Sequence, residues 1–573
     1  MTAITLNDLG EDIICSNIAI HLSPEDIFSL SLVSHSFYSY LTTNDIFHLL
    51  YLKKFGSKPT PLNLSNYNWK ELFKLRSSSQ AKIYTWGSSQ LGRLGYLLSN
   101  APPENIANSG ISKNVHTPTN LTTFNGFVIS DISAGGFSFQ ILTNEGDLYF
   151  TGADWNKGER STSTPGPFET FDYKSTAASI PRVESLGSRR SLNGISMPFM
   201  GRRYDRDIEA PTSTPSADRQ TNPNLRKPSD QLDLSLPDPT GSSMKHQKKV
   251  KETNFVTKLL LPDNPEFPDR YVTSISSGRE HIIAIDNYHN IISWDTGNTS
   301  NVGVHIKFEG LRYDSINKIS AGWNLSACYI NHIGIVVWYS RAPVTKESSE
   351  ASTMISNANY LVIPNTDNCK IDDFLSGCDF ILYIKDGSLM RFNLHTSGYA
   401  SGSVDRNLVE DPFPVLGFDN WLNNYNIDNN GKASFTKITG CYNSFSIFTN
   451  DGMVLLGNKA LSDEESEEPP IIIPQLQKNH IIHVVIGDYH YMALTDEGDL
   501  YSWGTESSRC GCLGLGAKDE FVSQNSNNVV TDLGPGKGMV VHNPTLVKSP
   551  SPGGKWLAIT ASGWNSGGIY IPK

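Results

Sequence analysis

Residues 485–504, VIGDYHYMALTDEGDLYSWG, form one copy of a repeat that recurs along the chain and predicts its fold. The copy contains an apolar pair, a glycine, a strand, a tight turn and a second strand. Five further copies occupy residues 132–152, 275–297, 319–340, 374–393 and 438–458. Several of the turns combine Asn or Asp with Gly, which tolerates the positive φ of a tight hairpin. A repeat spacing of several tens of residues is typical of the blades of a β-propeller.

Two partial copies lie at the ends of the repeat region. Residues 81–95, AKIYTWGSSQLGRLG, supply the later part of a repeat, and residues 556–571, WLAITASGWNSGGIYI, supply the earlier part. Together they complete one blade, which makes six complete blades and one composite blade. A closed ring leaves no open sheet edge at the ends of the array. The sequence therefore predicts a mainly β fold, a seven-bladed β-propeller over residues 81–573 with a composite closing blade.

The segment before the propeller, residues 6–50, predicts short α-helices. Its apolar residues recur at steps of three and four, which places them on one face of a helix. Pro24 follows a serine and precedes two acidic residues, a pattern typical of the first turn of a second helix. Three short helices cannot bury this many large apolar groups among themselves. We therefore expect part of this surface to face a partner or the next domain.

Two stretches of this segment, LSPEDI (22–27) and LSLVS (30–34), resemble the centre of an F-box. The later stretch NWKELF (68–73) resembles the helix that often follows one. The usual Leu-Pro opening is Leu9-Gly10 here, and the first helix is one residue longer than the common spacing. By this resemblance, residues 1–55 form a small α-helical F-box and residues 56–80 form a helical linker.

The F-box resemblance also implies a binding surface and partners. The apolar residues would dock on a Skp-type adaptor, and through it on a cullin, by a helical interface with an apolar core. The alternative is an ordinary helical cap that packs on the propeller. The expected adaptor-binding residues are Leu9, Ile13, Ile14, Ile18, Leu22, Pro24, Ile27, Leu30, Leu32, Val33 and Phe37.

The repeats themselves resemble those of the regulator of chromosome condensation family. The family's pattern of Trp-Gly, a glycine and Leu-Gly appears in residues 86–95 and, two residues longer, in residues 503–514. The resemblance covers residues 81–152 and about 256–573. We interpret the tryptophans and glycines of this pattern as packing and turn residues, with no ligand-binding role.

A long insertion separates the first complete repeat from the second. Residues 153–255 are rich in Ser, Thr, Pro, Arg and Asp and lack a periodic apolar pattern, which predicts disorder. Thr164, Ser191 and Thr214 within it are candidate phosphorylation sites. Residues 463–468, DEESEE, predict a solvated acidic loop, and residues 505–555 predict a further irregular segment.

The composition excludes several classes of function. A net charge of −11 over 573 residues disfavours nucleic acid as a partner, because phosphate binding requires a basic surface. The seven cysteines have no C-x-x-C pairing, so we expect no zinc site and reduced thiols. No secretory signal or membrane span is visible, which predicts a cytoplasmic or nuclear protein without a membrane partner.

No catalytic motif has usable spacing, and we expect no cofactor and no catalytic residues. His281 and His490 recur after repeat glycines and are interpreted as structural.

Two functions follow from the resemblances. The order of F-box and propeller is similar to that of fungal SCF-associated factors. This similarity implies a non-catalytic substrate-recognition subunit of an SCF-type E3 ubiquitin ligase, whose propeller captures a protein client for proteasomal degradation. By the same resemblance adenine deaminase is one candidate client, although the residues do not identify it. The alternative is a guanine-nucleotide exchange factor for a small GTPase, as in the founding member of the repeat family. The acidic charge and the extra F-box argue against this alternative.

Overall fold

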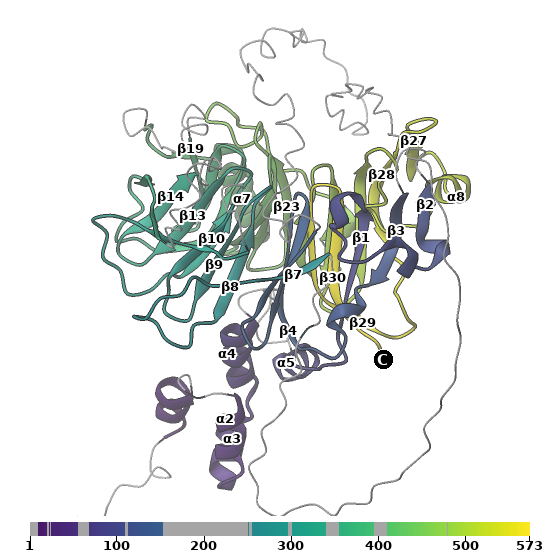
Figure 1. Cartoon of the computed structure of the whole chain (residues 1–573). Coiled ribbons are helices and arrows are strands. Elements are labelled where there is room, and N and C mark those ends of the chain that lie inside the picture. The colour runs from purple at the N-terminus through teal and green to yellow at the C-terminus, as the bar shows by residue number, and fades with distance from the viewer. Residues whose placement is uncertain are drawn as a thin grey trace, which may run out of the picture. The chain divides into compact units, whose positions relative to one another are not determined.

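The computed structural model describes residues 10–19, 22, 24–55, 68–108, 113–152, 250, 255–295, 301–339, 355–394, 409–477 and 479–573. Its strands form seven separate sheets, each mostly antiparallel, which confirms the predicted seven-bladed propeller (Figure 1). The predicted insertion at 153–255 lies almost entirely outside the described residues, as do Thr164, Ser191 and Thr214.

The first three complete blades in chain order contain thirteen strands. The first blade comprises β4 (Ile129–Gly135), β5 (Ser138–Thr143), β6 (Leu148–Thr151) and β7 (Val256–Leu259). The second comprises β8 (Val272–Ser277), β9 (Ile282–Asp286), β10 (Ile291–Trp294), β11 (Val304–Lys307) and, parallel to β11, β15 (Ile355–Asn357). The third comprises β12 (Lys318–Ala321), β13 (Leu325–Ile330), β14 (Gly334–Tyr339) and β16 (Tyr360–Val362).

The next three blades continue in chain order. The fourth comprises β17 (Ile371–Ser376), β18 (Phe380–Lys385), β19 (Ser388–Asn393) and β20 (Phe413–Pro414). The fifth comprises β21 (Phe435–Cys441), β22 (Ser444–Thr449) and β23 (Val454–Asn458), preceded by helix α7 (Leu416–Asn429). The sixth comprises β24 (Ile481–Ile486), β25 (His490–Thr495), β26 (Leu500–Glu506), β28 (Met539–Leu546) and β27 (Val530–Asp532).

The seventh blade joins the two ends of the repeat region. It comprises β1 (Lys82–Ser88), β2 (Ile106–Asn108), β3 (Lys113–Asn120), β29 (Lys555–Ser562) and β30 (Asn565–Ile571). Strand β1 pairs antiparallel with β30, with Lys82 opposite Tyr570. Trp86 of β1 is fully buried, and its indole N–H donates to the Cys512 carbonyl at 3.0 Å. The ring of Trp86 lies 5.7 Å from that of Trp556 on β29, so aromatic packing joins the two halves of this blade.

The first strands of the blades form the inner wall of the ring. Each of them contacts the first strand of the next blade, and β29 contacts β4, so the cycle closes. Polar bridges connect neighbouring blades. His281 and Ser326 share a side-chain hydrogen bond of 2.9 Å, and His490 and Ser566 share one of 2.7 Å. Burial lowers the pKa of His490 to about 4, which keeps the ring neutral near neutral pH. Both histidines therefore act as structural bridges.

The segment predicted to be irregular, residues 505–555, contains regular structure, so that prediction is wrong. Strands β27 and β28 extend the sixth blade outward from β26, and helix α8 (Lys518–Gln524) precedes them. These strands have no clear period-2 pattern because they form the outer part of the sheet, where much of each strand stays exposed.

Glu506, at the end of β26, is a buried carboxyl group. Burial raises its pKa to about 7, although the backbone N–H groups of Gly511 and Leu513 donate to it and Lys518 lies nearby. Between pH 4.5 and 7 the folded protein therefore holds more protons at this site than the unfolded chain does. By linkage, this site's contribution to the free energy of unfolding is full below pH 4.5 and decreases as pH rises through 7.

Replacing Glu506 with glutamine is expected to remove this pH dependence. The slope contributed by one carboxyl group is at most about 1.4 kcal/mol per pH unit, and glutamine does not titrate. Urea unfolding measured from pH 4.5 to 7.5 would show a flatter profile for Glu506→Gln than for the natural chain. The exposed Glu497 provides the control, since Glu497→Gln should leave the profile unchanged. Equal profiles for all three proteins would contradict the assignment.

The N-terminal segment is helical in the described residues. It comprises α1 (Glu11–Ile13), the π-helical turn η2 (Ile14–Ile18), α2 (Pro24–Ser31), α3 (His35–Leu41), α4 (Asn44–Phe55) and α5 (Trp69–Arg76). A π-turn closes its hydrogen bond over one more residue than an α-turn does. In η2 the Ala19 backbone N–H accordingly donates to the Ile14 carbonyl, five residues earlier.

Candidate protein-docking surface

The N-terminal helices bury an apolar core of their own. Its buried members are Ile14, Ala19, Ile27, Phe37, Leu41, Ile46 and Leu50, which come from η2, α2, α3 and α4 and the residue after η2. Half-buried Ile18, Leu22 and Leu30 pack against this core. The described members of this core all belong to the helical segment, so the helices form a packed module and are not merely a cap that uses the propeller as its interior.

Three residues of the predicted adaptor-binding set lie in this core. Ile14, Ile27 and Phe37 are at most 4% exposed in the free chain. The prediction also puts both Ile13 and Ile14 on one apolar helix face. The side chains of adjacent residues on a helix, however, point about 100° apart. Ile13 is accordingly 46% exposed while Ile14 is buried. Leu9 and the side chain of Pro24 lie outside the described residues.

A set of large apolar side chains on this module remains exposed to solvent. Phe28, Leu32 and Val33 are 66 to 68% exposed, and Tyr38 is 51% exposed. Seven of the seventeen exposed large apolar residues in the described chain lie within residues 13–52, a short part of its length. Such a concentration is typical of a protein-interaction site. We call Ile13, Phe28, Leu32, Val33 and Tyr38 the docking patch.

Phe28, Leu32 and Val33 of the docking patch lie in and just after α2, Tyr38 lies in α3, and Ile13 lies in α1. Phe28 and Leu32 are four residues apart and therefore lie over one another where α2 ends. The backbone N–H of Val33 donates to the Leu30 carbonyl at 3.1 Å, which closes the turn. Ser34 caps α3 by accepting a hydrogen bond from the Phe37 backbone N–H at 3.2 Å. The chain direction between the two helices is thus fixed by hydrogen bonds.

The predicted adaptor-binding set contains Leu32 and Val33 but not the exposed Phe28 and Tyr38. Ile27, by contrast, lies on the core-facing side of α2. Phe28 and Leu32 form a second apolar pair at four-residue spacing, out of phase with Ile27. This second pair was the sequence signal for an exposed face.

A second apolar core attaches helices α4 and α5 to the propeller. Tyr51, Phe55, Trp69 and Leu72 are buried in the same cluster as Ile83 of β1 and several residues of β4 and β29. Asn44 accepts a hydrogen bond from the Trp69 backbone N–H at 2.9 Å, which joins the starts of α4 and α5. Burial raises the pKa of Tyr51 to about 12 and keeps its hydroxyl neutral. These contacts make α5 a packed connection between the helical module and the propeller.

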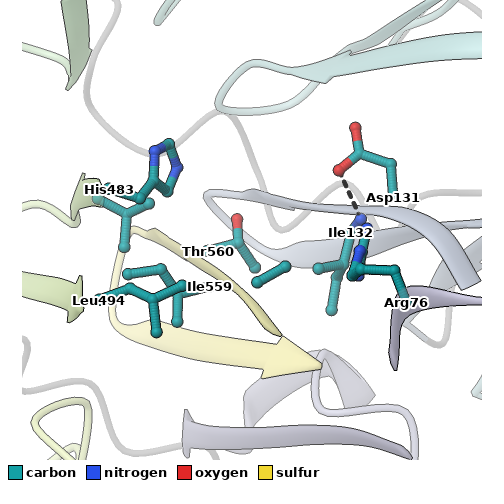
Figure 2. Close-up of a pocket in the computed structure, with 9 residues that line it drawn as sticks. Arg76, Asp131, Ile132, His483, Leu494, Ile559 and Thr560 are labelled. Atoms are coloured by element: carbon teal, nitrogen blue, oxygen red, sulfur yellow. Dashed lines mark hydrogen bonds between the residues drawn. The ribbon is translucent and has the colours of Figure 1, made fainter. Parts of the chain in front are cut away.

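A small cavity of about 60 Å³ lies where α5 meets the inner strands (Figure 2). Arg76 and Asp131 lie on one side of it and His483 and Leu494 on the other. The Arg76 side chain is 2% exposed, and its Nη2 donates to the Ser130 carbonyl at 2.7 Å. The volume fits about four water molecules, the ordinary acceptors for further buried guanidinium N–H groups. We interpret this cavity as structural.

Two features, a cluster of metal ligands and a membrane-spanning helix, are absent from the described residues. Within them, no three His, Cys, Asp or Glu side chains are grouped as metal ligands would be. In the same part of the chain, no helix combines the length and apolar character that crossing a bilayer requires. The chemistry available to the docking patch is apolar burial against another protein.

The described residues thus form a helical module with exposed apolar side chains, followed by a closed ring of seven sheets. The family model for the regulator of chromosome condensation (RCC1) repeat matches residues 481–512. SCF-associated factor 1 of Saccharomyces cerevisiae is 27% identical, and the match covers 99% of this chain and 98% of that protein. F-box protein pof9 of Schizosaccharomyces pombe is 24% identical over 45% of this chain and 49% of that protein. These similarities support an F-box protein with RCC1-like repeats.

The chain is also similar to solved structures. Prp20p of Saccharomyces cerevisiae is 13% identical, and the match covers 86% of this chain and 92% of that protein. Its TM-score is 0.47. Human WBSCR16 is 14% identical, and the match covers 85% of this chain and 98% of that protein. Its TM-score is also 0.47.

Proposed function

We propose that this chain is the non-catalytic substrate-recognition subunit of an SCF-type ubiquitin ligase. In this proposal the docking patch binds a Skp-type adaptor, which links the chain to a cullin. The propeller captures a protein client for ubiquitination and proteasomal degradation, in the cytoplasm, the nucleus or both. The observation that carries the proposal is the exposure of Phe28, Leu32 and Val33 on a module that already has its own core. The names of the relatives, SCF-associated factor and F-box protein, support it.

The energetics of the docking patch suit a protein partner. Each fully buried Phe, Leu or Val side chain contributes about 1.5–3 kcal/mol, so three of them supply a large part of a stable interface. Ile14, Ile27 and Phe37 hold the helices in one arrangement from inside. The patch is therefore ordered before binding, which reduces the entropy cost of association.

The chemical contribution of this chain is proximity. A bound client lysine is held near the ubiquitin thioester of the ligase complex, which raises its effective concentration. No residue of this chain needs to take part in bond making. The packed connection through α5 supports this role, because a rigid connection keeps the client at a defined distance from the adaptor.

The proposal is tested by affinity purification of the tagged chain with and without a proteasome inhibitor, followed by mass spectrometry. We expect the adaptor and a cullin in both samples, and a client enriched only under inhibition. Adenine deaminase is one named candidate to be checked in that sample. Absence of the adaptor and cullin from both samples would overturn the proposal.

A further inference from the structure

One tight turn from each blade lies at the end of the inner strands remote from α5. Arg76 of α5 binds the carbonyl of Ser130, near the start of β4, whereas β4 ends at Gly135, roughly 17 Å further along the strand. The turns between the first and second strands of the blades start at this far end. We call these seven turns the turn ring, comprising residues 136–137, 278–281, 322–324, 377–379, 442–443, 487–489 and 563–564.

Backbone hydrogen bonds between neighbouring blades fix the turn ring. Gly136 N donates to the Arg279 carbonyl at 3.0 Å, and Trp323 N donates to the Gly377 carbonyl at 3.0 Å. Further along, Cys378 N donates to the Tyr442 carbonyl at 2.9 Å. The side chains of the ring therefore project from a rigid frame, which suits a binding face.

Aromatic and arginine side chains meet on the turn ring. The Arg279 guanidinium lies 4.4 Å from the centre of the Trp323 ring and 5.6 Å from that of Phe137. The Trp323 and Tyr442 rings are 4.4 Å apart, although their blades are separated by another blade. Phe137, Trp323 and Tyr442 are only half-buried, and the neighbouring Tyr489 is 44% exposed. Trp, Tyr and Arg are the residues that dominate binding energy at protein interfaces.

One carboxylate oxygen in this ring lacks a hydrogen-bond donor, although the Gly563 backbone donates to the same carboxylate. The Oδ1 atom of Asp488 is buried, and no described residue donates to it. Burial raises the pKa of Asp488 to about 6, and the nearby charges of Arg279 and Arg93 only partly offset this effect. Asp488 as a residue is half-buried, and it adjoins the exposed Tyr489 in the same turn. A buried acceptor without a donor is costly, and a ligand that supplies one removes that cost.

We propose that the turn ring is the client-binding face, and that the client presents a lysine or arginine side chain to Asp488. This inference rests on the proposed function and adds to it where the client binds and which chemistry is recognised. A cationic side chain donates to the carboxylate and also interacts favourably with aromatic faces. The net charge of −11 favours approach of a basic partner over an acidic one.

The inference is tested with three labelled peptides that differ only at a central position. Acetylated and amidated Gly-Leu-Xaa-Leu-Gly, with Xaa as lysine, norleucine or glutamate, is titrated with the purified full chain and followed by fluorescence anisotropy at low salt. We expect the lysine peptide to bind about tenfold more tightly than the other two. Tighter binding of the glutamate peptide, equal binding of all three, or no saturable binding would overturn the inference.

Two variants show which residues cause the preference for the lysine peptide. Asp488→Asn should abolish the lysine preference, and Trp323→Ala should weaken binding of the lysine and norleucine peptides alike. The matched control is Glu497→Gln, since Glu497 is an exposed carboxylate outside the turn ring and should not affect the preference. Thermal unfolding of each variant shows whether it is folded. A folded Asp488→Asn variant that keeps the lysine preference contradicts the inference.

A cellular measurement separates this inference from the proposed function. Client half-lives are compared in cells that express the natural chain, Asp488→Asn, Trp323→Ala or a variant with a charged docking patch. We expect the same proteins to be stabilised in all three variants, while the two turn-ring variants still co-purify with the adaptor. Unchanged half-lives together with retained adaptor binding would reject the turn ring and leave the ligase proposal standing.

Discussion

Replacing Leu32 and Val33 together with aspartate is expected to lower the affinity for a Skp-type adaptor by at least about a hundredfold. Burial of each side chain contributes about 1.5–3 kcal/mol, and the two introduced charges must be desolvated at the interface. Both residues are more than 65% exposed in the free chain, so the double variant should fold normally. Surface plasmon resonance with purified adaptor measures the loss, and thermal unfolding checks the fold.

Two further variants show whether the effect is specific to the docking patch. Ile427 on α7 is 73% exposed, so Ile427→Asp introduces a charge at an equally exposed apolar residue outside the patch and should leave adaptor affinity unchanged. Ile27→Ala removes a buried side chain and is expected to destabilise the helical module by about 2–5 kcal/mol. Normal adaptor affinity of the Leu32 and Val33 double variant would show that the patch is not the docking site.

Replacing Trp86 with alanine is expected to lower the free energy of unfolding by about 3–5 kcal/mol, the usual cost of truncating a fully buried aromatic residue. Trp86 packs against Trp556, so its loss removes contacts between the first and last parts of the chain in the composite blade. The Cys512 carbonyl keeps one donor, the Ser566 hydroxyl at 2.8 Å, so the main loss is packing. Urea unfolding followed by circular dichroism measures the change.

Trp421 provides the matched control for this prediction. It is a half-buried tryptophan on α7 that stacks on Tyr425 at 5.0 Å, outside the composite blade. Trp421→Ala should cost about 1 kcal/mol, because less apolar surface leaves the interior. If the two substitutions destabilised the protein equally, the closure of the ring would not depend on the packing of Trp86.

The propeller was predictable from sequence because each blade repeats the same local signals. Strand, Gly-containing turn and strand recur at positions such as Gly452 and Gly498, whose φ values of +100° and +91° require residues that tolerate this region. The outer strands β27 and β28 were not predictable in this way. They lie at a sheet edge, pair only with β26 and with one another, and stay partly exposed, so they have no alternating apolar pattern.

The helical module was predictable as a unit, but the division of its residues was not. The spacing of Ile13, Ile14, Ile27 and Leu32 indicates helices with apolar faces. It does not indicate which apolar residues face the module's own core and which face solvent. That division depends on how α2, α3 and α4 pack on one another, and packing angles are not written in the periodicity of a single helix.

By itself, the sequence of this protein determined the repeated strands, the composite blade that joins both ends and the helices in front of them, because these depend on local spacing and turn chemistry. The tertiary structure alone decided that Phe28, Leu32 and Val33 remain exposed, and that Asp488, Arg279 and Trp323 lie on one ring of turns. Residues from different blades become neighbours only when the ring closes. Exposure and proximity are properties of the packed chain, and for this reason both surfaces proposed to act in function required the folded structure.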